Sequence, residues 1–262
     1  MKVLIVYAHP EKQSLTHSLK EVAVQKLKED GHEVIVSDLY AMKWQASIEP
    51  TDFLNHDEDT RLNVMLDSGI AYEAGALTED VLAEQEKLRW ADTVIFQFPF
   101  WWFHMPAIMK GWIDRVFSFK FAYGVGEHTA THYGDQYGEG PFTNKRALII
   151  TTIGGHKSHY TERGIGGNID YLLFPINHGI LYYPGFQVLP SFCVYETIKM
   201  NNGTFNNWAD KLRNYLDDLE TKKRIPYRIQ NGGDYNLLEL TLKEGTESPG
   251  QTGLNIHLDL TK

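Results

Sequence analysis

The sequence predicts an α/β protein built on a doubly wound parallel sheet of five strands, with helices on both faces. Two observations predict this class: short, almost unbroken apolar runs recur along the chain, and segments with helical spacing lie between them. Runs without polar alternation are typical of strands that are covered on both faces, as in parallel sheets. The 262 residues suffice for one large domain with a full hydrophobic core.

The predicted strands cover residues 3–8, 34–37, 93–98 and 147–152, and a less pure fifth candidate covers 186–194. The first helix follows the first strand, because apolar residues recur there at helical spacing as far as Gly31, a plausible stop signal: Leu15, Leu19, Val22, Ala23 and Leu27.

Further helical patterns cover residues 79–90, 107–117 and 208–219. After about Thr221 the chain changes character, since "NGGDY" and "GTESPGQTG" break it into short polar pieces. We therefore predict one domain over residues 1–220 and an appended arm or small subdomain over residues 221–262.

Net charge, cysteine count and apolar runs indicate which kinds of partner and which cellular compartment to expect. A formal charge of −9 and a pI near 5.6 argue against nucleic acid or an anionic membrane surface as the main partner. Cys193 is the single cysteine, which excludes an internal disulfide and fits a reducing compartment. No run approaches the roughly 20 apolar residues of a membrane span, and the N-terminal apolar run is too short for a signal peptide. We expect a cytoplasmic protein without a membrane span.

Ligands of doubly wound sheets bind at the carboxyl ends of the strands, so three loops matter most: residues 9–16, 99–105 and 152–160. In the first, "HPEKQSLT", a helix N-terminus with the hydroxyls of Ser14 and Thr16 suits a phosphate, and His9 stands at the strand end. Ser14 or Thr16 could equally be a simple helix cap. No G-x-G-x-x-G and no Walker lysine occurs here, which counts against a dinucleotide fold of that type.

The second loop holds four consecutive aromatic residues, Phe100 to Phe103, between Pro99, which ends a strand, and Pro106, which suits the first turn of a helix. Neither a strand nor a helix needs four aromatics in a row. They are either a lid folded back on the core or a platform for a planar ring, where stacking contributes roughly 1–3 kcal/mol per ring.

The third loop, "TTIGGHKSHY", brings Gly154 and Gly155 to the same edge, where their small size lets the backbone approach a ligand. Tyr160 offers a phenol there, and His156 and His159 could supply protons. Together the loops give a phosphate end, an aromatic wall and a glycine floor, which suits a flavin nucleotide. His128 and His132 have the spacing of metal ligands on a helix but sit among glycines, so we predict a flexible loop there and no metal site.

The sequence resembles the NAD(P)H:quinone oxidoreductase family of the DT-diaphorase type, in a bacterial-type form. The resemblance runs from about residue 2 to 195, and its most specific segment is "AEQEKLRWADTVIFQFPFWWFHMPAIMKGWIDRVF". Further matching segments are "LIVYAHPEKQSLTHSLKE", "SDLYAM", "FAYG", "EGPF", "TTIGG" and "FPINHGILYYPGFQVL".

This resemblance implies a flavodoxin-like fold, a homodimer with active sites at the subunit interface, and bound FAD. It also implies ping-pong hydride transfer from NAD(P)H to the flavin and then from the flavin to a quinone. The segment "ETIKMNNGT" after Tyr195 lacks the family's usual adenine-side arginine pattern, which leaves FMN as the alternative cofactor.

The resemblance also implies roles for single residues. The pyrophosphate would be held by His9, Ser14, Leu15 and Thr16. The isoalloxazine ring would be lined by Pro99, Phe100, Trp101, Trp102 and Phe103, of which Trp102 and Phe103 also face the substrate. Its polar edge would contact Thr152, Ile153, Gly154, Gly155 and Tyr160. Tyr123 and Tyr183 match aromatic residues that the neighbouring subunit adds to the substrate pocket.

One departure concerns the catalytic pair. The family pairs the tyrosine with a histidine six residues later, and Gly166 stands at that position. Tyr160 would then act alone, or His156 or His159 would substitute. Our candidate catalytic residues are therefore Tyr160, Gly155 and His159.

The leading hypothesis is an FAD-dependent NAD(P)H dehydrogenase that acts on quinones. An azo- or nitro-compound reductase is the neighbouring alternative. The alternative from another class is an ancillary regulatory flavoprotein subunit of a potassium-efflux system.

Overall fold

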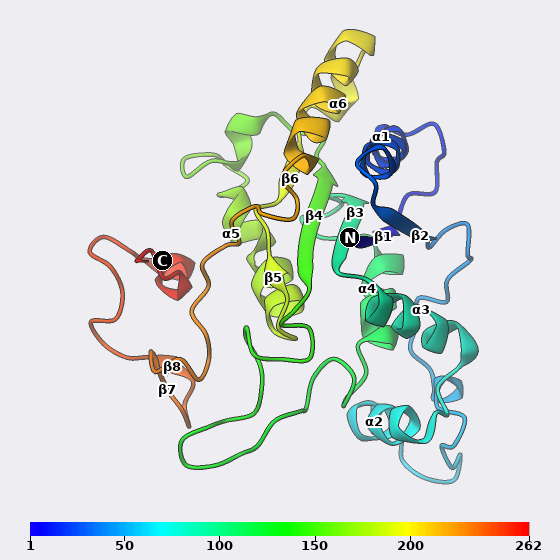
Figure 1. The fold of residues 1–262 in the computed structure, drawn as a ribbon, viewed down its shortest axis with the longest axis vertical. Coiled ribbons are helices and arrows are strands. Elements are labelled where there is room, and N and C mark those ends of the chain that lie inside the picture. The colour runs from blue at the N-terminus through cyan, green and yellow to red at the C-terminus, as the bar shows by residue number, and fades with distance from the viewer. Residues whose placement is uncertain (262) are drawn as a thin grey trace.

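The computed structural model describes residues 1–261 and shows one parallel sheet in the order β2-β1-β3-β4-β5, with the short strand β6 also paired to β4 (Figure 1). The bounds of its strands are β1 Lys2–Tyr7, β2 Glu33–Asp38, β3 Thr93–Pro99, β4 Arg146–Thr152, β5 Gln187–Val188 and β6 Phe192–Val194. The predicted doubly wound α/β fold is confirmed. The fifth predicted strand, however, is two short strands, because Pro190 between them has no N–H with which to continue the ladder.

The helices are α1 Leu15–Glu29, α2 Val64–Ala74, α3 Glu79–Trp90, α4 Ala107–Val116, α5 Ile169–Phe174 and α6 Asn202–Leu216, and α5 continues into a π-helix, Pro175–Tyr182. Gly31 follows the end of α1 with a φ of 82°, as a stop signal should. Helix α6 begins earlier than predicted because Asn201 and Thr204 form a capping box.

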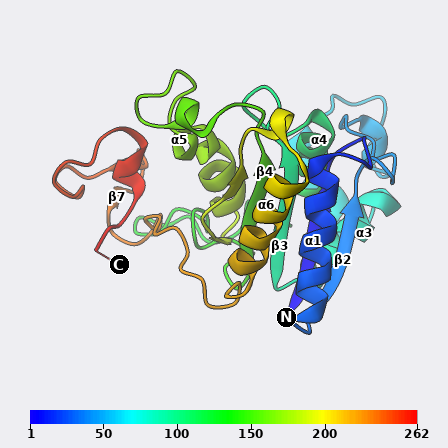
Figure 2. The same cartoon turned by 90° about the horizontal axis from the view of Figure 1, so that it is seen from above.

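Two layers of helices cover the two faces of the sheet. On one face, α1 and α6 lie side by side and pack against Val3 and Ile5 of β1 (Figure 2). On the other face, α3, α4 and α5 pack against Leu4 and Val6. Alternate residues of one strand therefore serve two separate cores, which explains why the strand shows no polar alternation.

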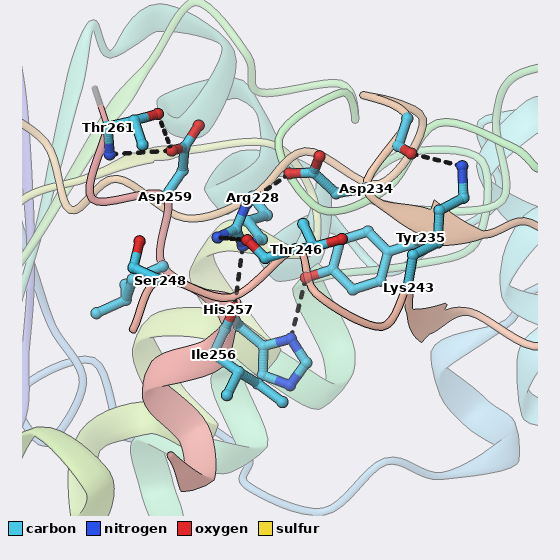
Figure 3. Close-up of polar contacts among 12 residues, drawn as sticks. Arg228, Asp234, Tyr235, Lys243, Thr246, Ser248, Ile256, His257, Asp259 and Thr261 are labelled. Atoms are coloured by element: carbon cyan, nitrogen blue, oxygen red, sulfur yellow. Dashed lines mark hydrogen bonds and ion pairs between the residues drawn. The ribbon is translucent and has the colours of Figure 1, made fainter. Parts of the chain in front are cut away.

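The chain after α6 runs along the π-helix side of the molecule (Figures 1 and 2). It forms a small antiparallel pair, β7 Tyr235–Asn236 and β8 Thr241–Leu242, and is tied to the body where Ile225 N–H donates to the Val188 carbonyl at 2.7 Å. The buried Arg228 guanidinium holds this segment together, since it donates to the Thr246 and Ile256 carbonyls (Figure 3). Its assignment as a unit separate from residues 1–220 stays a prediction.

No helix in the described part of the chain combines the length and the apolar character that a membrane crossing needs.

Candidate active site at the carboxyl edge of the sheet

The three loops selected from the sequence meet at the carboxyl ends of β1, β3 and β4. The Thr16 and Thr152 hydroxyls share a hydrogen bond of 2.8 Å between the first and third loops. Gln97, near the carboxyl end of β3, donates to the Thr16 carbonyl at 2.9 Å, and the rings of His9 and Trp101 lie 5.6 Å apart. Each loop is therefore fixed to a neighbour by a direct contact.

The first loop presents donors at the start of α1. Ser14 is the helix cap and accepts from the His17 N–H at 3.1 Å, so the capping role considered from the sequence is the one that the structure shows. The N–H groups of Leu15 and Thr16 have no acceptor within residues 1–261. With the positive end of the helix dipole, they are suited to bind an anion.

His9 adds a third donor beside them. The Glu11 N–H donates to its Nδ1 at 3.0 Å, and burial lowers the pKa of the ring, so the imidazole is neutral at physiological pH. Because Nδ1 accepts, the ring proton must sit on Nε2. His9 therefore offers one N–H while bearing no charge.

The aromatic loop is only partly the platform predicted. Phe100 is 9% exposed and belongs to the core, so it is not one of four open rings. Trp101, Trp102 and Phe103 are 42%, 95% and 49% exposed. Trp102 and Phe103 hold φ values of 51° and 62°, a left-handed backbone that costs of order 1–3 kcal/mol in large residues and concentrates at functional sites. The backbone strain of this loop therefore lowers the stability of the fold, while the loop exposes three aromatic rings.

The glycine loop is fixed by strand β6 and by the residue that follows Tyr195. Buried Ile153 donates to the Val194 carbonyl at 2.7 Å, and the Gly155 carbonyl accepts from the Glu196 N–H at 3.1 Å. A Cβ on Gly154 would meet only Ile198, so the face of Gly154 is open. A Cβ on Gly155 would stand 3.0 Å from the Tyr160 ring, tighter than an ordinary contact, so a side chain at this position would require the ring to move by a few tenths of an ångström.

Tyr160 lies among three rings, those of Phe100, Tyr195 and His159. Its ring centroid is 6.4 Å from Phe100 and 6.0 Å from Tyr195. A Cβ on Gly166 would stand 2.9 Å from the His159 carbonyl and 3.1 Å from the Tyr160 ring, so a histidine at this position would force the surrounding backbone to shift. His159 lies 6.4 Å from Tyr160, between ring centroids, and is exposed.

Tyr123 and Tyr183 lie together but apart from this edge of their own chain. Their ring centroids are 6.4 Å apart, and both line one hollow with Ile180. Tyr123 follows the carboxyl end of α4, whereas the aromatic loop precedes its start, and ten helical residues span about 15 Å. One chain therefore does not bring these tyrosines to its own Trp102.

Three residues of this edge were not predicted as site residues: Gln97, Tyr195 and Glu196. Gln97 could have been noticed as an amide side chain in an otherwise apolar strand end, but no sequence signal marks the other two. Within residues 1–261 no three His, Cys, Asp or Glu side chains gather as metal ligands, and His132 is paired with Asp135 at 2.7 Å.

Comparison with known proteins identifies the family. A family model for the flavodoxin-like fold matches residues 1–216. A ribosyldihydronicotinamide dehydrogenase-like protein of Penicillium crustosum is 52% identical over 257 residues, 98% of this chain and 95% of the relative. NAD(P)H dehydrogenase (quinone) 1 of Rattus norvegicus is 44% identical over 196 residues, 74% of this chain and 69% of the relative.

A solved structure agrees with these relatives. A Klebsiella pneumoniae protein assigned as a quinone reductase is 53% identical to this chain and superposes with a TM-score of 0.96, covering 99% of this chain and 100% of that one. The chain therefore belongs to the NAD(P)H:quinone oxidoreductase family of flavodoxin-like proteins.

Proposed function

We propose that the protein is an FAD-dependent NAD(P)H dehydrogenase that reduces quinones by two electrons at the carboxyl edge of the sheet. Family membership makes it a flavin-dependent oxidoreductase with quinones as the substrate class. The assignment of the site rests on one observation, that three loops lie together at this edge. The first presents free N–H donors, the second exposed rings and the third an open glycine face.

These residues fit a flavin. The N–H groups of Leu15 and Thr16, with the Nε2–H of His9, would bind the pyrophosphate. Trp102 and Phe103, exposed at the end of β3, would cover the ring, and a bound flavin would supply the site at which hydride is stored between the two half-reactions. Gly154 would let the backbone approach the polar edge of the ring.

We propose Tyr160 as the proton-holding group of the reaction. Its ring is fixed between Phe100 and Tyr195, and Gly155 makes room for it. Since Gly166 has no side chain with which to share a proton, Tyr160 would place its hydroxyl proton against charge that develops at the ring edge. His159, exposed beside it, would exchange that proton with solvent.

A homodimer with shared sites is part of the proposal. Tyr123 follows the carboxyl end of α4, and Tyr183, which follows the π-helix, lies beside it, whereas Trp102 precedes the start of α4, so a second copy would supply these tyrosines to its neighbour's site. Helix α2 supports this arrangement, since it leaves an apolar surface open: Val64, Met65, Leu66 and Ile70 are 39–57% exposed. A single half-buried cysteine, Cys193, supports a cytoplasmic location.

The relatives named above are dehydrogenases and a reductase, which favours an enzyme over the ancillary-subunit alternative. The test is to purify the protein, release its chromophore by heat, identify it as FAD or FMN, and follow NADH and NADPH oxidation with menadione. We expect released FAD and quinone-dependent oxidation of the nicotinamide. A colourless protein that no flavin reconstitutes, or a bound flavin that neither nicotinamide reduces, would contradict the proposal.

A further inference from the structure

A small cavity lies between the start of helix α5 and the C-terminal arm, and it shares no residue with the three loops of the candidate site (Figure 1). Its volume is about 210 Å³, below the roughly 300–1,000 Å³ of sites for drug-sized ligands, so it suits a small molecule. None of the residues assigned above to the flavin or to the quinone lines it. Its walls include Asp170, Tyr171, Ile225, Tyr227, Leu254 and Leu258.

Asp170 brings to this cavity a carboxylate without a partner. It stands in the first turn of α5, where an acid is ordinary because the N-terminal end of a helix is positive. The helix cap, however, is Asn168, whose side chain accepts from the Asp170 N–H at 2.8 Å. Within residues 1–261 the Asp170 carboxylate itself accepts no hydrogen bond and forms no ion pair.

The surroundings of this carboxylate disfavour its negative charge. Asp170 stands at the mouth of the cavity, where it remains exposed to solvent. Its partial burial there raises its pKa, and the nearby Glu162 carboxylate raises that pKa further. No lysine, arginine or histidine of the described chain lines the cavity to offset these effects. A cationic ligand would supply the missing counter-charge.

The Tyr227 hydroxyl adds a second polar group that a ligand can reach. It has no hydrogen-bond partner within residues 1–261 and stays open to solvent. Burial of the side chain raises the pKa of this phenol most, and the negative charge of Asp170 raises it further, so the two groups are neighbours and the phenol is protonated at physiological pH. A protonated phenol can accept a hydrogen bond from an ammonium group and donate its own proton to a carboxylate.

Tyr171 contributes a ring that no other aromatic ring contacts within residues 1–261. Its hydroxyl accepts from the Asn255 amide at 2.8 Å, which fixes the ring between α5 and the arm. An uncovered tyrosine face beside a carboxylate attracts a positive charge, because the face of the ring is the negative part of its quadrupole.

The rest of the lining is largely apolar. Ile225, Leu254 and Leu258 come from the arm, and Pro190 comes from the segment between β5 and β6. A buried amide in the wall, that of Asn177, already donates to the Ser191 hydroxyl at 3.0 Å. A hydrocarbon group of a ligand would therefore leave water at this end of the cavity, where apolar side chains would surround it.

We propose that the cavity binds a small primary amine as its ammonium ion, with the N–H groups on the Asp170 carboxylate and the hydrocarbon part against the apolar side chains of the arm. The unpaired carboxylate selects the positive charge. The open Tyr227 hydroxyl favours a primary amine, which can donate to both oxygen groups. A metal ion lacks sufficient ligands here, since no three His, Cys, Asp or Glu side chains gather within residues 1–261. The proposal does not depend on the flavin.

The test is calorimetric titration of the protein as purified with benzylamine and, separately, with benzyl alcohol at neutral pH. The two probes share a ring, but only the amine is charged. We expect saturable one-to-one binding of benzylamine with a dissociation constant on the order of 1 mM, ordinary for so few atoms, and at least about tenfold weaker binding of the alcohol. Absence of saturable benzylamine binding, equal affinity for the alcohol, or a change in the flavin absorbance on binding would overturn the proposal.

Two matched substitutions test the carboxylate. Asp170→Asn removes the charge at the cavity mouth, whereas Glu162→Gln removes the neighbouring charge, which does not line the cavity. Benzylamine affinity should fall at least about tenfold in the first variant and stay within about twofold in the second. Equal losses in both would show that the amine responds only to the general negative charge of the surface, which would contradict the proposal.

A second pair of substitutions locates the hydrocarbon part of the ligand. Leu258→Trp fills the cavity, whereas Leu260→Trp adds the same ring two residues later at a position that is 59% exposed. Benzylamine affinity should fall at least about tenfold in the first variant and stay within about twofold in the second. Affinity unchanged by Leu258→Trp in a folded protein would place the ligand elsewhere and refute the proposal.

A measurement on the parent protein guards against misfolded variants. In ¹⁵N-labelled protein, benzylamine should shift the side-chain amide resonances of Asn255, which lines the cavity, and these resonances are assigned by their loss in Asn255→Asp. Shifts confined to other regions of the molecule would overturn the proposal even if Leu258→Trp or Asp170→Asn failed to fold.

Discussion

Replacing Thr16 and Thr152 by valine, singly and together, tests whether the first and third loops hold each other in place. Both hydroxyls are buried, at 2% and 6% exposure, and their 2.8 Å bond is the only side-chain bond that joins these loops within residues 1–261. Valine has the shape of threonine without the hydroxyl, so a single substitution leaves the other hydroxyl unpaired. Each single variant should lose about 1–3 kcal/mol of unfolding free energy.

The double variant Thr16→Val with Thr152→Val should be nearly as stable as the parent, because replacing both partners by apolar groups of the same shape leaves no unpaired group. The two substitutions should thus couple by roughly 2–6 kcal/mol, the sum of the two single losses, and so be far from additive. As a control we choose Thr151→Val, because Thr151 donates to the Phe98 carbonyl and not to Thr16. Combined with Thr16→Val, it should add its effect independently.

The assay is urea unfolding followed by circular dichroism, with flavin removed and the protein concentration fixed, since both flavin and dimer formation would shift the apparent stability. If the double variant is as unstable as the sum of the single variants, the hydroxyls do not hold each other. The two loops would then be positioned independently of this hydrogen bond.

Three further predictions concern the site and the buried His178 of the π-helix. Trp102→Ala should weaken flavin binding by about 1–3 kcal/mol without changing protein stability, because the ring is 95% exposed. As a control, Leu260→Ala removes another exposed apolar side chain and should change neither flavin affinity nor protein stability. Tyr160→Phe should slow flavin reduction by NAD(P)H about tenfold in stopped-flow traces and slow quinone reduction less; equal rates in variant and parent would remove Tyr160 from the mechanism. His178 stays neutral when folded but takes up a proton when unfolded below about pH 6.5, so stability should fall as pH falls from there towards 3, by up to about 1.4 kcal/mol per unit from this group. Urea midpoints at neutral and acid pH should show a shallower fall for His178→Phe, and an equal fall would contradict this origin.

Local sequence chemistry was enough to predict the strands and the edge that carries the site. Each strand of the main sheet except the last pair is an apolar run that the pattern marks, and parallel strands bring their following loops to one edge. The exposure of Trp102 and Phe103 also followed from position, since Pro99 ends a strand and Pro106 precedes a helix.

Contacts between distant segments could not be predicted in this way. That Phe100 turns inward while Trp102 turns outward depends on a left-handed backbone that no residue type there favours. The π-helix likewise depends on how the arm packs against His178, and an aromatic residue at helical spacing is typical of ordinary core.

The most direct test of the assigned function follows the bound chromophore through both half-reactions. Anaerobic protein is mixed first with NADH or NADPH and then with menadione, while the flavin absorbance is recorded. We predict that the nicotinamide bleaches the flavin band and that the quinone restores it, one two-electron equivalent in each step. A flavin band that the nicotinamide leaves unchanged, or that menadione fails to restore, would contradict quinone reduction through the flavin.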